Sequence, residues 1–569
     1  MQQSQLPMDT PRVEDHHVSK PRHIGNTIFP NFPIFNRLLF FAHNHTSIAV
    51  KDVTNKLQGT HAQLLSDVLH VRNALRNSLD ERTRQKLLNG DLVTITLLAP
   101  GGYEFAAGFL AIVALGAVVV PISIAVPVEE ALYFAKTARA AATLCASKHA
   151  PFGQQLAQRR KADNPTFISM NIRDHIGQPQ IPPPQMIVSS DHHLDYQGAG
   201  LIIFTSGTSG PPKGAVKRRS FLDMNAQAIS LWYNLQPGDV VLHTLPVHHA
   251  TGIGISFLPF LLSGAAIEFQ SSGFNPAQIW DRWRRGGLTV FSGVPTMYMR
   301  LMRFFEEDIK KRPPAEVSAC VNAARAFRIM MSGSAALPFS LQSKWIKLLG
   351  GKRILERYGA TEFSSVFSVK PGDIDNPDGS VGKAFFGLEV KLSNGDEGEI
   401  LVKSPHIFTE YIHDPKTTAA AFNEDGYYKT GDIGRREGDY YFILGRASID
   451  IIKSGGYKIS ALDIEREILD LPYVGEVMVV GVGDEEYGQR VAVAITVQNK
   501  EPLTLEKLRA DLRSRLSGYK LPTLLRVVDE LPKSASGKVV KRVLSKQIFP
   551  PSGHPDIQTW KAKPPQAKI

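Results

Sequence analysis

A segment rich in glycine and hydroxyl side chains, Thr205–Gly214, constrains this chain more than any other feature. It consists of Thr-Ser-Gly-Thr-Ser-Gly-Pro-Pro-Lys-Gly and follows an apolar run at 200–204 that is typical of a buried strand. Backbone N–H groups and side-chain hydroxyls can converge on phosphate oxygens in such a loop. The pattern predicts that a polyphosphate binds where this strand ends, and a flexible surface linker is the alternative.

The predicted loop differs from a Walker loop. Lys213 is followed by Gly214 instead of Ser or Thr, and the two prolines before it prevent the turn into a helix that a Walker loop needs. Lys213 would instead supply a mobile positive charge for the polyphosphate. The candidate phosphate contacts are Thr205, Ser206, Gly207, Thr208, Ser209, Gly210 and Lys213.

The composition indicates a large globular protein. Hydrophobic residues make up 43% of the chain and charged residues 21%, which excludes an intrinsically disordered protein. A length of 569 residues exceeds one ordinary core, so two or more domains are expected. The net charge of +11 is spread along the chain without interleaved aromatic residues, which favours acidic small molecules over nucleic acid as partners. Cys145 and Cys320 predict neither a disulfide framework nor a thiolate metal site, and a reducing compartment fits.

Targeting and membrane signals are sparse. An uncharged run from Phe105 to Val128 is long enough to span a membrane, but glycines and prolines divide it, so a core helix followed by a buried strand is favoured. The N-terminus has no apolar signal core, and its acidic residues argue against a transit peptide. The C-terminal tripeptide Ala567-Lys568-Ile569 resembles a peroxisomal address, which predicts an import receptor as partner and the peroxisome, or else the cytoplasm, as location.

The chain divides into four predicted segments. Residues 1–30 form a variable N-terminal segment, 31–445 a layered α/β domain, 446–546 a small α+β domain and 547–569 a Pro-rich tail. In the small domain the patterns predict helices at 461–471 and 506–516 and strands at 474–482 and 491–497, with Glu465 and Glu467 on the outer face of the first helix. Residues 178–197 are predicted to be a surface connection.

Three further motifs carry groups that nucleotide chemistry needs. Tyr358–Glu362 places a hydroxyl beside a carboxylate at the end of a strand, where they can hold a phosphate and Mg²⁺, although a surface turn is the alternative. Tyr428–Asp432 places a carboxylate on a glycine turn, which suits ribose hydroxyls, and Arg446 could complete that grip. Lys538 lies on a glycine-containing loop, from which it can neutralise charge that develops when a carboxylate attacks a phosphate.

In this order the motifs make the chain resemble the adenylate-forming superfamily of acyl-CoA synthetases and ligases over nearly its whole length. The matching pieces are Thr205–Gly214, Pro246–His249, Ser332–Ala335, Tyr358–Glu362, Tyr428–Asp432, Gly445–Arg446, Ser454–Lys458 and Gly537–Lys538. The resemblance implies a large N-terminal domain and a small C-terminal domain that rotates between two half-reactions. ATP and a carboxylic acid first give an acyl-adenylate and pyrophosphate. The thiol of CoA then attacks the adenylate, and AMP leaves.

The resemblance also implies a role for each matching residue. Lys538 would bridge the acyl carboxylate and the α-phosphate, with Glu362 and Thr208 on Mg²⁺ and Thr361 on phosphate. The predicted adenine contacts are Ser334, Ala335, Glu356, Tyr358 and the adjoining Gly359. Asp432 and Arg446 would bind the ribose. Ser454, Gly455 and Gly456 would line the pantetheine tunnel, and His249 would be a gate to the acyl pocket.

The residue before the Tyr358–Glu362 motif indicates which class of carboxylic acid the chain would activate. Family members that bind neutral acyl tails usually have a small residue there, whereas this chain has Arg357. A guanidinium is costly to bury unpaired unless the substrate brings a second carboxylate. Arg300 lies where a second cation could reach the same pocket, and the chain resembles the malonyl-CoA synthetase branch, which uses an arginine pair. The alternative leaves Arg300 solvated and Arg357 paired with Glu356 or Glu362.

The sequence therefore predicts an AMP-forming ligase of a short dicarboxylic acid, malonate first and methylmalonate second, that uses ATP, Mg²⁺ and CoA. The alternatives are a ligase of a medium-chain or aromatic acid and a free-standing adenylation enzyme that loads a carrier protein. A protein that only binds nucleotide is disfavoured because Lys538, Glu362 and Thr361 are all present. No nucleic-acid or membrane partner is indicated.

Overall fold

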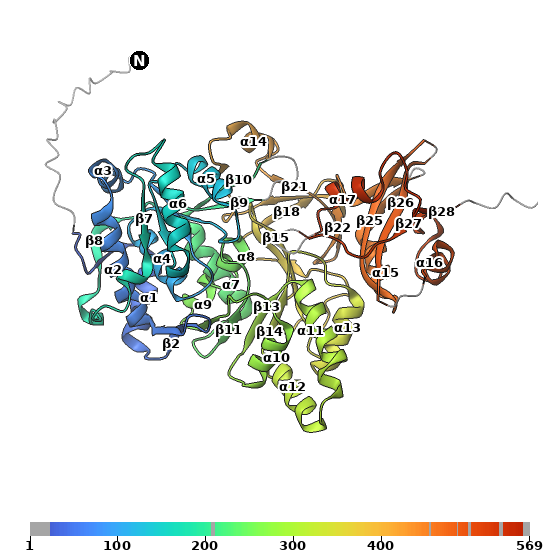
Figure 1. The fold of residues 1–569 in the computed structure, drawn as a ribbon, viewed down its shortest axis with the longest axis horizontal. Coiled ribbons are helices and arrows are strands. Elements are labelled where there is room, and N and C mark those ends of the chain that lie inside the picture. Colours follow the sequence, from blue (N-terminus) through green and yellow to red (C-terminus); the bar gives the residue numbers. More distant parts are fainter. Residues whose placement is uncertain are drawn as a thin grey trace, which may run out of the picture.

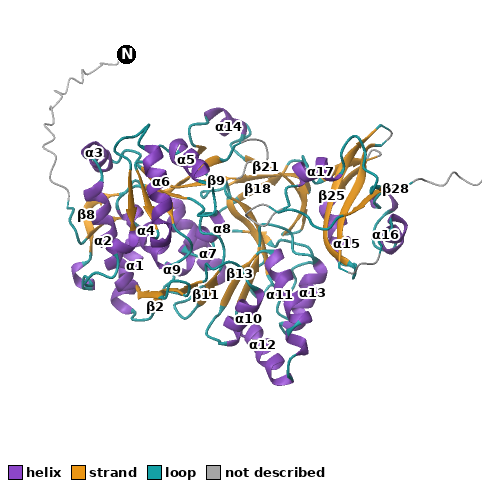
Figure 2. Ribbon diagram, in the orientation of Figure 1, coloured by secondary structure: helices purple, strands orange, loops and turns teal. Residues whose placement is uncertain are grey.

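The computed structural model describes residues 23–205, 211–454, 457–485, 487–498, 502–533 and 539–560. It consists of a large domain, coloured blue to yellow in Figure 1, and a smaller C-terminal domain, coloured orange to red, beside it. Helices and strands alternate through both domains (Figure 2), which confirms the predicted α/β class with a small second domain. The tripeptide Ala567–Ile569 and most of the variable N-terminal segment lie outside the described residues.

The first sheet of the large domain carries the predicted phosphate loop. Its central strands are parallel and its β9–β10 edge is antiparallel. In spatial order the strands are β20 (Glu410–Tyr411), β10 (Lys213–Arg218), β9 (Ala199–Thr205), β5 (Val118–Pro121), β4 (Thr94–Leu98), β6 (Ala142–Cys145) and β7 (Ile168–Asn171). Every residue of β4, β5 and β6 is buried, as expected of parallel strands that are covered on both faces.

The second sheet carries the nucleotide and acyl motifs at its antiparallel edge. Its strands, in spatial order, are β17 (Lys383–Ala384), β16 (Ser364–Ser368), β15 (Leu355–Ala360), β14 (Ile329–Ser332), β13 (Val290–Gly293), β11 (Val240–His243), β12 (Ala266–Phe269), β2 (Ile48–Asp52) and β3 (Leu57–Thr60). A short pair, β1 (Ile28–Asn31) with β8 (Ile187–His193), lies outside the two sheets. The predicted surface connection at 178–197 is largely exposed, but it contains the strand β8, which pairs in parallel with β1 and was not predicted.

The helices of the large domain cover these sheets. They are α1 (Pro33–Asn44), α2 (His61–Ser78), α3 (Glu81–Asn89), α4 (Tyr103–Ala114), α5 (Val128–Thr137), α6 (Ala150–Arg160), α7 (Ala226–Tyr233), α8 (Ala250–Gly254), α9 (Leu258–Leu261), α10 (Pro276–Arg284), α11 (Pro295–Glu307), α12 (Pro314–Ala326) and α13 (Phe339–Leu348). The uncharged run from Phe105 forms the buried helix α4 and then β5, as predicted. Within the described ranges, no helix is both long and apolar enough to cross a membrane.

A third sheet connects the two domains. It contains β18 (Glu389–Leu392), β19 (Glu397–Lys403), β21 (Tyr428–Glu437) and β22 (Tyr440–Arg446), with α14 (Pro415–Ala420) before β21. The turn of Gly431 and Asp432 lies within β21, and β22 ends at Arg446, directly opposite Asp432 in the antiparallel register. Two predicted nucleotide contacts on consecutive strands are thus neighbours across one ladder.

The C-terminal domain packs helices against a mixed sheet, in which β26 and β27 are parallel and the other pairs are antiparallel. Its elements are β23 (Ile451–Ser454), β24 (Tyr457–Ser460), α15 (Ala461–Leu469), β25 (Val474–Asp484), β26 (Gly488–Val497), α16 (Leu505–Leu512), β27 (Leu524–Val527), α17 (Lys541–Ile548) and β28 (Gln558–Thr559). The domain contacts α13, where the backbone N–H of Ser340 donates to Oδ1 of Asp470 at 3.2 Å. A cleft of about 490 Å³ separates α11 from β25 and β26 and is lined by Arg303, Glu307, Gly475, Glu476, Thr496, Val497, Gln498, Asp529 and Glu530.

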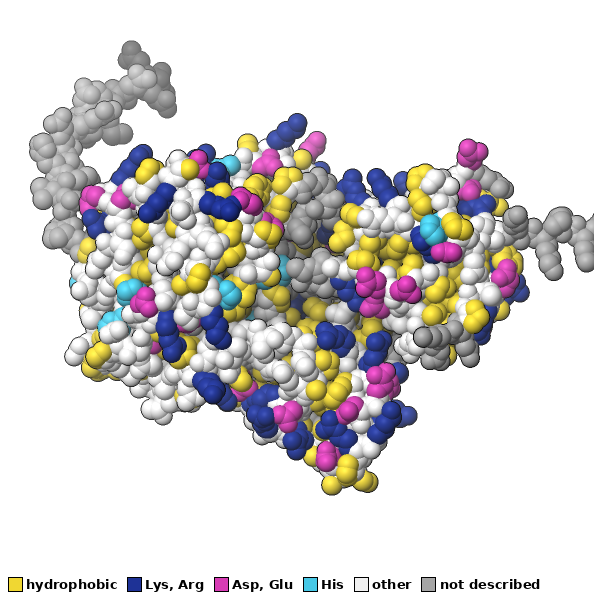
Figure 3. Space-filling model, viewed as in Figure 1, with side chains coloured by type: hydrophobic (Ala, Val, Ile, Leu, Met, Phe, Trp, Pro, Cys, Tyr) yellow, Lys and Arg dark blue, Asp and Glu magenta, His cyan; other side chains and the backbone are white. Residues whose placement is uncertain are grey.

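The prediction that Glu465 lies on the outer face of α15 is wrong. Its side chain is 14% exposed, and its Oε1 accepts a hydrogen bond from the N–H of Val479 at 2.7 Å and pairs with Lys541. On the surface, acidic and basic side chains are interspersed over the face viewed in Figure 3, in agreement with the scattered charges of the sequence.

Candidate active site

The predicted phosphate loop connects the antiparallel strands β9 and β10. Thr205 faces Lys213 across the ladder, and the Thr205 hydroxyl donates to the Lys213 carbonyl at 3.3 Å. Ser206, Gly207, Thr208, Ser209 and Gly210 lie outside the described residues. The ammonium of Lys213 lies 5.4 Å from the centre of the Tyr411 ring, and the Tyr411 hydroxyl donates to Oε1 of Glu362 at 2.8 Å. Tyr411 therefore contacts both Lys213, the predicted phosphate-binding lysine, and Glu362, the predicted Mg²⁺ ligand. The sequence analysis did not identify Tyr411.

The predicted ribose carboxylate is held from two sides. Asp432 is 7% exposed, its Oδ2 accepts from the Tyr358 hydroxyl at 2.6 Å, and its Oδ1 lies 2.9 Å from Nε of Arg446. Burial raises the pKa of the Tyr358 phenol, and the Asp432 carboxylate raises it further, so Tyr358 stays a donor at neutral pH. The pair of contacts fixes the orientation of the carboxylate, and the structure brings all three predicted residues together.

The predicted adenine contacts form two adjoining segments. Ser334 has a positive φ of 71° and is exposed together with Ala335 in the turn that follows β14. Glu356 on β15 is half-buried, and its Oε2 accepts from the N–H of Leu337 at 3.2 Å, so it supports the far end of that turn. Burial raises the pKa of Glu356 to about 7. At Gly359 any side chain would overlap the carbonyl of Ser364, which explains the glycine in this motif.

A fully buried lysine supports the Thr361–Glu362 turn from below. Nζ of Lys217 on β10 donates to the carbonyls of Glu362 at 3.0 Å and His406 at 2.7 Å, and to the Ser364 hydroxyl at 3.2 Å. Burial lowers the pKa of Lys217 to about 7. The sequence contains no signal for this contact, since a lysine within a strand normally indicates an exposed position.

The side chain of Arg357 is buried and has no acidic partner in the part of the chain that the structure describes. It is 6% exposed, and neither Nε nor Nη2 has a hydrogen-bond partner among the described residues, so pairing with Glu356 or Glu362 does not occur. Burial lowers the pKa of Arg357. Gly333 provides the space for this side chain, because a Cβ there would lie 2.9 Å from Cγ and Cζ of Arg357.

The two tyrosines beside Arg357 have their hydroxyls engaged elsewhere. The Tyr298 hydroxyl donates to the carbonyl of Met331 at 2.8 Å, and the Tyr233 hydroxyl lies 2.6 Å from the Ser368 hydroxyl. These groups therefore do not replace an anion at the guanidinium.

The structure does not join Arg300 to Arg357. Arg300 is exposed on α11, with its guanidinium 5.0 Å from the centre of the Phe274 ring and its Nη2 donating to the Phe274 carbonyl at 3.3 Å. The predicted arginine pair is therefore absent from the described conformation, because stacking on an aromatic ring retains Arg300 at the surface. His249 precedes α8, and its ring lies 4.3 Å from that of His248.

The remaining predicted residues belong to the C-terminal domain. Ser454 ends β23 and pairs with Tyr457, while Gly455, Gly456 and Lys538 lie outside the described residues. The two residues that flank the lysine loop are Lys533 and Val539, which form an isolated antiparallel bridge. The ends of that loop are therefore fixed next to each other.

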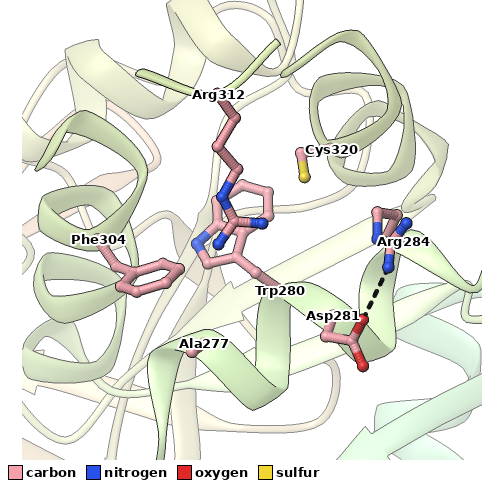
Figure 4. Close-up of a pocket in the computed structure, with 7 residues that line it drawn as sticks. All are labelled: Ala277, Trp280, Asp281, Arg284, Phe304, Arg312 and Cys320. Carbon is pink, nitrogen blue, oxygen red and sulfur yellow. Dashed lines mark hydrogen bonds and ion pairs between the residues drawn. The ribbon is translucent and has the colours of Figure 1, made fainter. Parts of the chain in front are cut away.

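A cavity of about 260 Å³ elsewhere is a poor candidate for the site. It lies between α10, α11 and α12 and is lined by Ala277, Trp280, Asp281, Arg284, Phe304, Arg312 and Cys320 (Figure 4). Its charged groups are satisfied within the protein, since Arg284 pairs with Asp281 at 3.1 Å and Arg312 with Asp308 at 2.6 Å. None of the predicted site residues lines it.

Comparison with known proteins decides the family. Residues 42–412 match the AMP-binding enzyme family, and residues 463–538 match the AMP-binding enzyme C-terminal domain. The chain belongs to the AMP-binding enzymes. It is 35% identical over 489 residues to a malonate–CoA ligase of Arabidopsis thaliana, an alignment that covers 80% of this chain and 78% of that protein.

Solved structures agree with this assignment. The ATP-bound MatB of Rhodopseudomonas palustris superposes with a TM-score of 0.77 at 25% identity and covers 90% of this chain and 98% of its own. A malonyl-CoA ligase with methylmalonyl-CoA and AMP bound gives a TM-score of 0.58 at 28% identity. The superposition covers 86% of this chain and 97% of the ligase. This AMP-binding enzyme is an AMP-forming acyl-CoA synthetase, as its family and its CoA-ligase relatives show.

Replacement of Glu356 by Gln is predicted to change how stability depends on pH. The native pKa of about 7 exceeds the ordinary value of 4.5, so the native state binds the extra proton in this interval. The free energy of unfolding of the wild type, relative to Glu356→Gln, should fall by about 3 kcal/mol as the pH rises through that interval. Thermal midpoints of both proteins between pH 4.5 and 8 measure this difference. The exposed Glu424→Gln is the control, and parallel pH profiles of wild type and Glu356→Gln would contradict the prediction.

Replacement of Tyr358 by Phe is predicted to weaken ATP binding. The change leaves the buried Asp432 carboxylate with one oxygen unpaired, which costs about 1.4 kcal/mol, so KM for ATP should rise about tenfold. Steady-state kinetics at saturating acid and CoA give this value. Tyr427→Phe removes a matched hydroxyl that donates to Glu389 at 2.8 Å and should leave KM unchanged. An equal effect of both variants would show that Tyr358 does not act through the nucleotide site.

Proposed function

We propose that this acyl-CoA synthetase activates a short dicarboxylic acid, malonate first and methylmalonate second, and gives its CoA thioester, AMP and pyrophosphate. The observation that supports the acid is the buried Arg357, whose Nε and Nη2 have no partner among the described residues. A planar guanidinium is best satisfied by a carboxylate that bonds two of its N–H groups. One carboxylate of the acid would pair with Arg357, and the other would remain free for adenylation.

The activities of the relatives support this choice of acid. One is a malonate–CoA ligase and one solved structure is a malonyl-CoA ligase with methylmalonyl-CoA bound, each about one third identical or less to this chain. The distal carboxylate is assigned to Arg357 alone, since Arg300 lies against Phe274.

The other residues would act on the nucleotide. Asp432 would accept hydrogen bonds from the ribose hydroxyls, in the orientation that Tyr358 and Arg446 impose on it. Lys213, Thr205 and the hydroxyls of residues 206–209 would contact the polyphosphate, and Thr361 would donate to a phosphate oxygen. Lys538 would approach the acyl carboxylate and the α-phosphate, where it reduces the repulsion between two anions that must meet.

Glu362 is the residue that would hold Mg²⁺, together with Thr208. The Tyr411 hydroxyl donates to Oε1 of the Glu362 carboxylate at 2.8 Å, and among the described residues no side chain bonds its other oxygen. Among the described residues no group of three or more metal-ligating side chains occurs, so the ion would take its remaining ligands from phosphate and water. When bound, Mg²⁺ supplies charge neutralisation on the phosphates.

The location of the enzyme stays a prediction. The C-terminal tripeptide suggests the peroxisome and its import receptor, and the cytoplasm is the alternative. The assignment of Ser454, Gly455 and Gly456 to the pantetheine tunnel, and of His249 to an acyl gate, is also proposed from the family resemblance.

The choice of acid is tested with the variant Arg357→Met. Loss of the guanidinium should reduce kcat/KM for malonate about 100-fold, since truncation of one partner in a buried charged pair costs about 2–5 kcal/mol. CoA-dependent AMP formation with malonate, methylmalonate, succinate, acetate, octanoate and 4-coumarate measures this change.

The matched control is Arg300→Met, which removes an exposed guanidinium from the same domain and should have little effect on malonate. Wild-type activity confined to octanoate or 4-coumarate would overturn the dicarboxylate assignment. Activity only with a carrier-protein thiol would instead identify a free-standing adenylation enzyme.

The role of the lysine loop is tested by separating the two half-reactions. Lys538→Ala should abolish acid-dependent exchange of pyrophosphate into ATP, because the charge between carboxylate and α-phosphate is lost, and should spare thioester formation from supplied acyl-adenylate. Lys546→Ala removes an exposed lysine from the helix α17 that follows the loop and serves as the control. Equal losses in both half-reactions would refute the assigned role.

A further inference from the structure

A buried ion triad lies at the centre of the C-terminal domain. Nζ of Lys541 is 2.6 Å from Oδ1 of Asp450 and 2.7 Å from Oε1 of Glu465. The three side chains are 13%, 12% and 14% exposed. Nothing in the proposed chemistry uses these residues, and the sequence gives no local reason for their meeting, because Lys541 and Asp450 are 91 residues apart.

The triad is bonded directly to the backbone of the ribose arginine. Oδ2 of Asp450 accepts from the N–H of Arg446 at 3.0 Å, and the N–H of Asp450 donates to the Arg446 carbonyl at 2.7 Å. Gly445, with a φ of 124°, packs against Asp450 so closely that a Cβ would overlap it. Arg446 in turn pairs with Asp432. A continuous chain of bonds therefore runs from Lys541 through Asp450 and Arg446 to the nucleotide site.

The other side of the triad reaches the segment that carries Lys538. Lys541 is the first residue of α17 and follows Lys538 by three positions. Val539 is bridged to Lys533, and Lys533 pairs with Glu476 on β25. Glu465 also accepts from the N–H of Val479 on β25 at 2.7 Å. The residues on both sides of 534–538 are thus fixed to the same strand and the same ion triad.

The charges of the triad require Lys541 to remain protonated. Burial alone would lower the pKa of Lys541, but the carboxylates of Glu465 and Asp450 raise it above its ordinary value. Burial also raises the pKa of Glu465. A buried ion pair of this kind adds little stability compared with apolar side chains of the same volume, so its clearest effect is to select one geometry. Without Lys541, two buried carboxylates would face each other and Asp450 would turn away from Arg446.

We propose that Lys541 is a positioning residue for adenylation, which through Asp450 and Glu465 ties the start of α17, three positions after Lys538, to the backbone of Arg446. This inference rests on the proposed role of Lys538. The Lys541 ammonium pairs with Asp450, which bonds the backbone of Arg446, and with Glu465, which bonds β25. The start of α17 and the arginine that would bind ribose are therefore positioned together.

The test compares Lys541→Met with Lys541→Arg in the full-length enzyme. Adenylation is measured by acid-dependent pyrophosphate exchange, and thioester formation by reaction of CoA with supplied acyl-adenylate. Lys541→Met should lower kcat for exchange about 30-fold and raise KM for ATP, with a loss in thioester formation at least tenfold smaller. Lys541→Arg retains the charge and should recover most of the exchange activity. Lys507→Met, at an exposed pair with Asp511 in the same domain, is the matched control.

A triple variant excludes a trivial loss of folding. Lys541→Met with Asp450→Asn and Glu465→Gln removes every charge and retains side-chain volume, so it should fold and show the same selective loss of exchange. Unchanged exchange in Lys541→Met, or equal losses in both half-reactions together with a lowered thermal midpoint, would overturn the inference. Lys538→Ala in parallel separates the two claims. If it abolishes exchange while Lys541→Met does not, only the positioning role fails, whereas full exchange in Lys538→Ala refutes the assigned role of Lys538 itself.

Discussion

The buried carboxylate of Asp432 is the constraint on which the rest of the site depends. A carboxylate that is 7% exposed must be paired, and its partners come from two other elements, Tyr358 on β15 and Arg446 at the end of β22. The hydrogen bond to Tyr358 joins the second sheet to the third, and the ion pair with Arg446 joins the third sheet to the point where the C-terminal domain begins. The candidate nucleotide site and the connection between domains are therefore joined through the same side-chain contacts. A shift at either end changes the environment of the same carboxylate.

The residues that would touch ligands are positioned by buried polar groups that do not. Glu362 is fixed at its carboxylate by Tyr411 and at its carbonyl by Lys217, so both its side chain and its backbone are held. Glu356 bonds the backbone of Leu337 and thereby supports the turn of Ser334 and Ala335. In each case the support is a strong hydrogen bond in a region with little water, where a partner left unpaired is costly. This arrangement produces a rigid site at the edges of two sheets, as positioning chemistry requires.

Local patterns in the sequence predicted the elements, and long-range contacts decided what was missed. Apolar runs identified β5 and β9, and the helix before β5 followed from its glycine and proline breaks. The strand β8 was missed because its sequence, Ile-Val-Ser-Ser-Asp-His-His, is mostly polar and is defined only by pairing with β1. Glu465 was assigned to the surface because it lies beside the apolar positions of α15, yet Lys541 supplies a buried partner from α17. Motif spacing grouped Asp432 with Arg446, and the two side chains are in contact, whereas no spacing encodes the stacking of Arg300 on Phe274.

The unpaired Arg357 has a consequence for selectivity. The free enzyme already bears the cost of removing this guanidinium from water, and two of its nitrogens have no partner among the described residues. If Arg357 lines the acyl pocket as proposed, an acid with a second carboxylate would restore those bonds on binding. An acid with an apolar tail would leave the charge unpaired and place apolar surface against it. Discrimination of this type is large and asymmetric, because a buried polar group rejects a ligand that cannot satisfy it far more strongly than an apolar pocket rejects a small excess of methylene groups. The pocket would therefore select its acid mainly by excluding neutral tails, and an additional attraction from Arg300 is not required for that exclusion.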